Sequence, residues 1–125
     1  MRYTLLLHYP EETVESAGAE AIEDGQRAFA SYAALLHEAG VLLSAEVLQS
    51  SASSTTLRMV DDSLRVQDGP YADTKEQLGG TFVIDVDDLD AAIDWAHQAP
   101  PVRWGAVEVR PGATHVVDGR WQPNA

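Results

Sequence analysis

The chain has 125 residues, of which 45% are hydrophobic. This is enough for one compact domain with an ordinary core, and it excludes wholesale disorder. Eight Lys and Arg against twenty Asp and Glu leave a net charge of −12, which opposes direct binding to nucleic acid or to an anionic membrane surface. The absence of cysteine excludes disulfides, thiolate nucleophiles and cysteine-ligated metals.

We expect a single domain over residues 1–125 without a membrane-spanning segment, because no apolar run approaches the roughly 20 residues that cross a bilayer. Residues 1–8 carry one basic side chain and a short apolar run, and no small-residue cleavage site follows them. They are more typical of a first strand than of a signal peptide, so the expected compartment is the cytoplasm.

The first half of the chain predicts four strands and one helix. The strands cover residues 2–9, 41–48, 55–60 and 64–67, and the helix covers residues 19–39. Four apolar side chains recur at helical spacing and form one stripe of the helix: Ile22, Phe29, Ala33 and Leu36. The polar run Asp61-Asp62-Ser63 is typical of a hairpin turn, and residues 49–54 predict a loop.

The second half of the chain predicts two further strands around a second helix. The strands cover residues 81–86 and 106–110, and the helix begins at Asp87 or Asp88 and ends before Pro100. Its apolar stripe is Leu89, Ala92, Ile93 and Ala96, and the tail adds a short strand at residues 115–117. This order is the βαββαβ plan of a ferredoxin-like α+β domain with an inserted hairpin, whose helices cover one face of an antiparallel sheet.

The predicted strands are apolar on both faces, as Leu5-Leu6-Leu7 and Phe82-Val83-Ile84 show. Because exposed Leu and Val side chains favour association, we expect a homodimer whose sheets stack face to face, a dimeric α/β barrel. Alternation along the strands places on the barrel side Thr4, Leu6, His8, Leu42, Ser44, Glu46, Thr81, Val83, Asp85, Ala106, Glu108 and Arg110. A one-residue bulge inverts this assignment for the strand that contains it.

His8 and Asp85 are the candidate catalytic residues. Parallel pairing of the first and third core strands would place both near the same end of the sheet. His8 suits a general base, because histidine exchanges protons at neutral pH, and Asp85 or Asp68 would orient it. The alternatives are a histidine that is hydrogen-bonded at the dimer interface and a solvated carboxylate that caps the next helix.

The candidate ligand-binding residues come from the last core strand and from the loop after the hairpin. Glu108 and Arg110 share a strand face and could present a carboxylate and an anion-binding guanidinium, or form an ion pair across strands or subunits. In the loop, where Gly69 and Pro70 restrain the backbone, the candidates are Asp68, Tyr71, Lys75 and Glu76. The alternative is that Asp68 and Lys75 hold the loop against the barrel or the partner subunit.

The loop motif resembles the signature of the YCII-related, DGPF-type family. The residues that carry the resemblance are Asp68-Gly69-Pro70-Tyr71-Ala72-Asp73-Thr74-Lys75-Glu76-Gln77-Leu78-Gly79-Gly80, together with Met1-Arg2-Tyr3, the strand and helix start at 82–90, and Val107-Glu108-Val109-Arg110-Pro111. Tyr71 stands where the family name implies Phe, and the 112–125 tail lies outside the shared pattern. The resemblance implies a ferredoxin-like dimeric α/β barrel. Better-understood YCII relatives resemble lyases with a His–Asp pair, but their histidine lies in a different segment.

The sequence predicts no metal and no cofactor. His37, His97 and His115 lie on separate elements without ligand spacing, and the phosphate-binding and serine-hydrolase motifs are absent. Two functions remain open, besides the alternative of a purely structural oligomer. One is binding of a small organic molecule in the barrel cleft, with cofactor-independent lyase or isomerase chemistry. The other, which family resemblance raises, is a non-catalytic interaction module linked to an extracytoplasmic-function sigma factor pathway.

Overall fold

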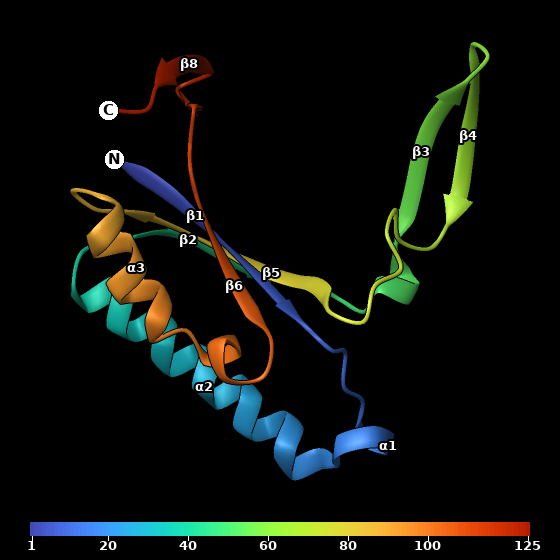
Figure 1. The fold of residues 1–125 in the computed structure, drawn as a ribbon, viewed down its shortest axis with the longest axis horizontal. Coiled ribbons are helices and arrows are strands. Elements are labelled where there is room, and N and C mark those ends of the chain that lie inside the picture. The colour runs from blue at the N-terminus through green and yellow to red at the C-terminus, as the bar shows by residue number, and fades with distance from the viewer.

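The computed structural model describes residues 1–125, apart from the side chain of Val14. Its centre is an antiparallel four-stranded sheet in the order β2–β5–β1–β6, and helices cover one face of it (Figure 1). The sheet strands are β1 (Arg2–Tyr9), β2 (Leu42–Val47), β5 (Gln77–Asp85) and β6 (Ala106–Pro111). The helices are α1 (Val14–Ala17), α2 (Ala19–Glu38) and α3 (Leu89–His97), with short 3-10 helices η1 (Ser51–Ser53) and η2 (Pro100–Arg103). This is an α+β fold, as the sequence predicts.

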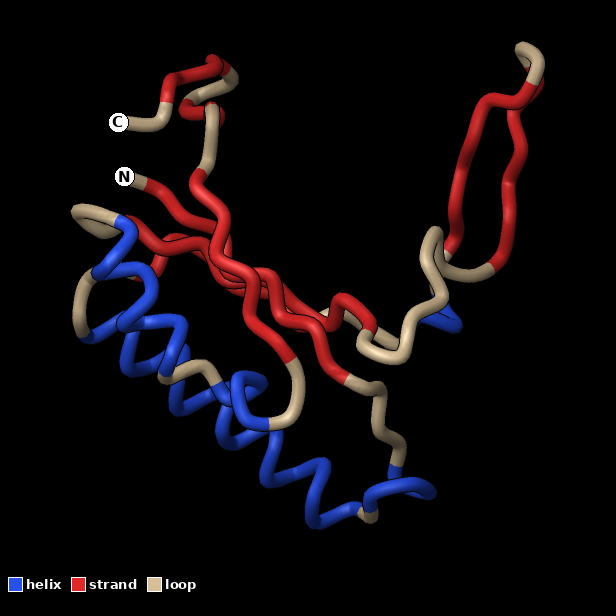
Figure 2. Tube along the Cα trace, viewed as in Figure 1, coloured by secondary structure: helices blue, strands red, loops and turns tan.

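Two hairpins rise from opposite ends of the sheet on the side away from the helices (Figure 2). One consists of β3 (Thr55–Val60) and β4 (Ser63–Asp68), and the other of β7 (Thr114–Val117) and β8 (Arg120–Pro123). In the first hairpin, Asp61 and Asp62 both have positive φ angles, 49° and 63°. This is the conformation of a two-residue turn that matches the strand twist, and it confirms the predicted hairpin.

The core lies between the sheet and the helices. Its fully buried side chains alternate along the strands, from Leu5 and Leu7 on β1 to Phe82 and Ile84 on β5. On α2, Leu36 is buried, as the predicted stripe requires. Tyr32 of α2 is also buried, which the sequence did not predict, and its hydroxyl donates a hydrogen bond to the Trp95 carbonyl oxygen at 2.7 Å.

Helix α3 begins as predicted but is rotated relative to its predicted stripe. The Asp88 side chain accepts a hydrogen bond from the Ala91 N–H at 2.9 Å and caps the helix. Ala92 and Ala96 are buried, whereas Leu89 and Ile93 are about half exposed. The small alanine side chains let this nine-residue helix approach the sheet closely, whereas Leu89 and Ile93 point outward.

The strand faces follow the predicted alternation on β1 and β5, but not throughout β2. The pairing of β2 with β5 shifts between Leu42 and Ser44, which marks a bulge at Leu43. Leu42 therefore pairs with Ile84 and packs against the core, so its predicted place on the barrel side is wrong. After the bulge, Ser44 and Glu46 pair with Val83 and Thr81 on the face away from the helices.

The register also overturns the predicted proximity of His8 and Asp85. Strands β1 and β5 are antiparallel, so Asp85 pairs with Arg2 at one end and His8 pairs with Leu78 at the other. The six residue-to-residue steps from Arg2 to His8 span about 20 Å of extended strand. His8 and Asp85 therefore cannot act as a catalytic pair within one chain.

Candidate functional site

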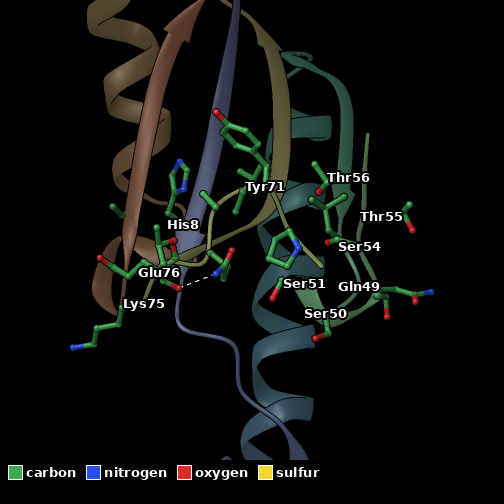
Figure 3. Close-up of a pocket in the computed structure, with 18 residues that line it drawn as sticks. His8, Gln49, Ser50, Ser51, Ser54, Thr55, Thr56, Tyr71, Lys75 and Glu76 are labelled. Atoms are coloured by element: carbon green, nitrogen blue, oxygen red, sulfur yellow. Dashed lines mark hydrogen bonds between the residues drawn. The ribbon is translucent and has the colours of Figure 1, made fainter. Parts of the chain in front are cut away.

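A cavity of about 1050 Å³ lies at the end of the sheet from which the β3–β4 hairpin rises (Figure 3). Its volume is slightly above the range of roughly 300–1,000 Å³ that is typical of small-molecule sites. The lining residues are His8, Leu48–Ser51, Ser53–Thr56, Pro70–Ala72, Thr74–Leu78 and Ala106. Of the predicted site residues, the cavity thus brings together His8, Tyr71, Lys75 and Glu76.

His8 reaches the cavity from the last part of β1. Its alternation with the buried Leu7 places it on the sheet face away from the helices, as predicted. The Nε2 atom of His8 lies 3.3 Å from Oε1 of Glu108 on the neighbouring strand β6. Because an ionised carboxylate only accepts hydrogen bonds, this contact assigns the hydrogen to Nε2 and leaves the lone pair on Nδ1.

Glu108 joins His8 to Arg110 on the open face of the sheet. Its second oxygen, Oε2, accepts a hydrogen bond from the Arg110 guanidinium at 2.6 Å. This hydrogen bond, followed by the charge of Arg110 and the contact with His8, holds the pKa of the Glu108 carboxyl below its ordinary value. The ion pair considered from the sequence is therefore present, but it joins two residues of one strand rather than two strands or two subunits.

One wall of the cavity is a serine-rich segment that the sequence predicted only as a loop. It contains the short helix η1, and the Ser50 side chain accepts a hydrogen bond from the Ala52 N–H at its start. The Glu11 carboxylate accepts hydrogen bonds from the Ser51 N–H at 2.7 Å and from the Ser51 hydroxyl at 3.0 Å. The segment that follows β1 thus holds this wall in place. The cluster of hydroxyl side chains at residues 50–56 was the feature of the sequence that could have indicated a polar cavity wall.

The opposite wall is the loop that follows the hairpin. Gly69, with a φ of 108°, donates its N–H to the Ser54 carbonyl oxygen at 2.8 Å and so joins the two walls. The Arg58 guanidinium lies 5.3 Å from the centre of the Tyr71 ring, a cation–π geometry. In Figure 3, Tyr71 lies on the same side of the cavity as His8, whereas the Lys75 side chain points away from both.

Four predicted site residues are not among those that line the cavity: Glu108 and Arg110, on β6 beside His8, and Asp68 and Asp85, which lie elsewhere. Asp68 pairs with Thr55 at the base of the hairpin and is not among the described residues that line the cavity. Asp85 lies at the far end of the sheet, where it accepts a hydrogen bond from the Met1 ammonium group at 2.7 Å. That hydrogen bond is the main reason why the pKa of Asp85 is lowered, and the charges of Met1, Arg2 and His115 lower it further.

The described part of the chain contains no cluster of three or more His, Asp or Glu side chains that could hold a metal ion. Within the same residues, no helix is long and apolar enough to cross a membrane. The groups in or beside the cavity that can act on a ligand include an imidazole supported by a carboxylate, several hydroxyls and an exposed phenol.

The comparison with known proteins identifies the family. The model of the YCII-related domain matches residues 1–114. The chain belongs to the YCII-related family. A curated relative, "Uncharacterized protein R00369" of Rhizobium meliloti (strain 1021), is 36% identical over an alignment of 120 residues, and the match covers 92% of this chain and 94% of the relative. Membership in the YCII-related family confirms the resemblance carried by the loop motif.

Proposed function

We propose that this YCII-related chain is a homodimer with a ferredoxin-like dimeric α/β barrel arrangement. The order β2–β5–β1–β6, with helices on one face, is compatible with that plan. The other face presents Leu6 and Val83, and covering a Leu or Val side chain fully contributes about 1.5–3 kcal/mol. A second sheet stacked on this face would cover both side chains.

The dimer is tested by placing a charge in the centre of the open face. Val83→Glu should convert a dimer to a monomer in sedimentation equilibrium, because a carboxylate would be left unpaired between the two sheets. The control is Val102→Glu, since Val102 is partly exposed in η2 on the helical side of the molecule. Equal sedimentation of the Val83→Glu variant and the wild-type chain as dimers would contradict stacking through this face.

We further propose that the cavity binds a small organic molecule and that His8 accepts a proton from it. The observation that carries this proposal is the contact between His8 Nε2 and Glu108, at the edge of a cavity large enough for a metabolite. Glu108 takes the orienting role that the sequence assigned to an aspartate. It favours a basic Nδ1 on the neutral imidazole and stabilises the imidazolium after proton transfer. A lyase or isomerase step without a cofactor needs such a proton acceptor.

The test is a metabolite screen that compares the wild-type chain with His8→Ala and His37→Ala. Binding is measured by thermal shift, and proton abstraction by the exchange of ligand hydrogens with deuterated water in NMR spectra. We expect His8→Ala to lose exchange and His37→Ala to retain it, because His37 is exposed near the end of α2. Exchange that is unchanged in His8→Ala would remove His8 from the chemistry. Binding without exchange in the wild-type chain would favour a non-catalytic binding module.

A further inference from the structure

The β3–β4 hairpin carries an apolar face that nothing in its own chain covers. Leu57 pairs directly with Val66, and Met59 pairs directly with Leu64, so the four side chains share one face. Each of them is between 58% and 65% exposed. Every residue of the two strands except Thr56 is exposed. An isolated two-stranded hairpin is only marginally stable in water, so this element needs a partner surface.

We propose that the hairpin is a dimerisation arm, whose apolar face packs against the same face of the hairpin in a second copy of the chain. The proposal rests on the face-to-face dimer proposed above. Stacked sheets lie about 10 Å apart, whereas six-residue strands such as these extend about 20 Å. Because the hairpin rises on the open side of the sheet (Figure 1), it extends past the plane between the subunits and overlaps the partner.

The distribution of charge favours a second copy as the occupant. The four side chains of the apolar face are uncharged, so two copies of this face can meet across a two-fold axis without repulsion. On the opposite face, Arg58 pairs directly with Arg65, and contact between two such faces would bring four guanidinium groups together. The chain as a whole carries a net charge of −12, which opposes close approach through its acidic surfaces. The hairpin, residues 55–68, contains two arginines and three aspartates and so carries a net charge of only −1.

Association of the hairpins would also hold the cavity in shape, because the base of the hairpin forms part of its lining. Thr56 lines the cavity, and its hydroxyl donates a hydrogen bond to the Gly69 carbonyl oxygen at 2.8 Å. Arg58, on the same face of the hairpin as Thr56, contacts the Tyr71 ring. A hairpin that is fixed by its partner therefore restrains Thr56 and Arg58, the two residues that join it to the loop. The shape of the cavity then depends on the dimer.

The experiment compares the dimer dissociation constants of the wild-type chain, the double variant Leu57→Thr and Val66→Thr, and the control Val60→Thr. Threonine is β-branched and has a high strand propensity, so it should preserve the hairpin, and Val60 lies on the opposite face of the hairpin. We expect the double variant to dimerise at least about a hundredfold more weakly in sedimentation equilibrium, because four apolar side chains per dimer are lost from the interface. The control should stay within about twofold of the wild-type value. Unchanged far-UV circular dichroism verifies the fold of each variant.

A second readout uses the absence of cysteine from the sequence. Met59→Cys should cross-link to its own copy with a short bismaleimide, whereas Val60→Cys, on the other face, should not. If the wild-type chain dimerises, two results would overturn the role of the hairpin and leave the proposed dimer standing. One is equal cross-linking of the Met59→Cys and Val60→Cys variants. The other is a dissociation constant of the double variant equal to that of the wild-type chain. A wild-type chain that sediments as a monomer overturns both, and then a different partner covers the hairpin.

Discussion

Gly105 is the position where a single methyl group should do the most damage to both the fold and the site. A Cβ atom at Gly105 would collide with the carbonyl oxygen of His8 and lie 2.9 Å from the Cα atom of Tyr9. Both contacts are with the main chain of β1, so no side-chain rotation relieves them. Gly105→Ala must therefore separate the start of β6 from the end of β1, where His8 pairs with Ala106.

The expected size of the effect follows from this overpacking. Inserting a methyl group into a closely packed position costs about 1–3 kcal/mol, and contacts with backbone place this change at about 2–3 kcal/mol. For a domain of this length, about 1 kcal/mol corresponds to a change of roughly 3–5 °C in Tm, so Gly105→Ala should melt roughly 6–15 °C below the wild-type chain. Thermal unfolding followed by far-UV circular dichroism measures the difference.

Gly25→Ala is the matched control, because it makes the same chemical change inside α2. Apart from its chain neighbours and the backbone of its own helix, a Cβ at Gly25 has no atom within 4 Å. Alanine is about 0.5–1 kcal/mol more favourable than glycine within a helix, so this variant should be more stable than the wild-type chain. A Gly105→Ala variant that melts within about 1 °C of the wild-type chain would refute the close approach of β1 and the segment before β6.

Three further predictions concern charged groups. Asp85 has a lowered pKa because its carboxylate accepts a hydrogen bond from the Met1 ammonium group. The contribution of this ion pair to the free energy of unfolding is therefore complete above the ordinary carboxyl pKa, and it disappears as the pH falls through the lowered pKa. Asp85→Asn should thus lower the free energy of unfolding by less than about 1 kcal/mol at neutral pH, since the side chain is half exposed. It should also weaken the fall of that free energy at acidic pH, as measured by urea unfolding. An unchanged pH dependence would contradict the ion pair. In NMR titrations, Arg110→Gln should raise the pKa of the Glu108 carboxyl toward its ordinary value, because the hydrogen bond that lowers it most is lost; an unmoved pKa would show that Arg110 is not the cause. Asp88→Ala should cost about 1 kcal/mol in urea unfolding through loss of the α3 cap, whereas Asp88→Ser should retain most of that stability, and equal losses would argue against capping.

The elements that the sequence predicted well are those whose residue pattern is set by burial. Leu5 and Leu7 on β1, and Phe82 and Ile84 on β5, alternate with residues of the open face because one side of each strand meets the helices. The same alternation placed His8 on the face where the structure has it. Such patterns are local, so they can be read from the sequence without knowledge of the neighbouring strands.

The errors arose where the answer depends on a neighbouring strand. The bulge at Leu43 leaves no pattern in the sequence, yet it turns Leu42 to the core. The direction of β5 relative to β1 keeps Asp85 away from His8, and the pairing of β6 with β1 brings Glu108 close to it; the pattern of strand faces contains neither fact. Likewise, the contact of Glu11 with Ser51 joins residues 40 positions apart, so the cavity wall could not be predicted as an ordered element.

The three tryptophans sit in separate parts of the molecule, which makes them independent optical probes. Trp95 on α3 packs against the core, Trp104 follows η2 beside a groove along α2, and Trp121 on the C-terminal hairpin is 71% exposed. Their fluorescence should therefore respond to different events. Emission from Trp95 would report unfolding of the core, whereas quenching of Trp121 by added iodide would report whether its hairpin is covered. Variants in which two of the three tryptophans are replaced by phenylalanine would allow the emission of each remaining tryptophan to be measured separately.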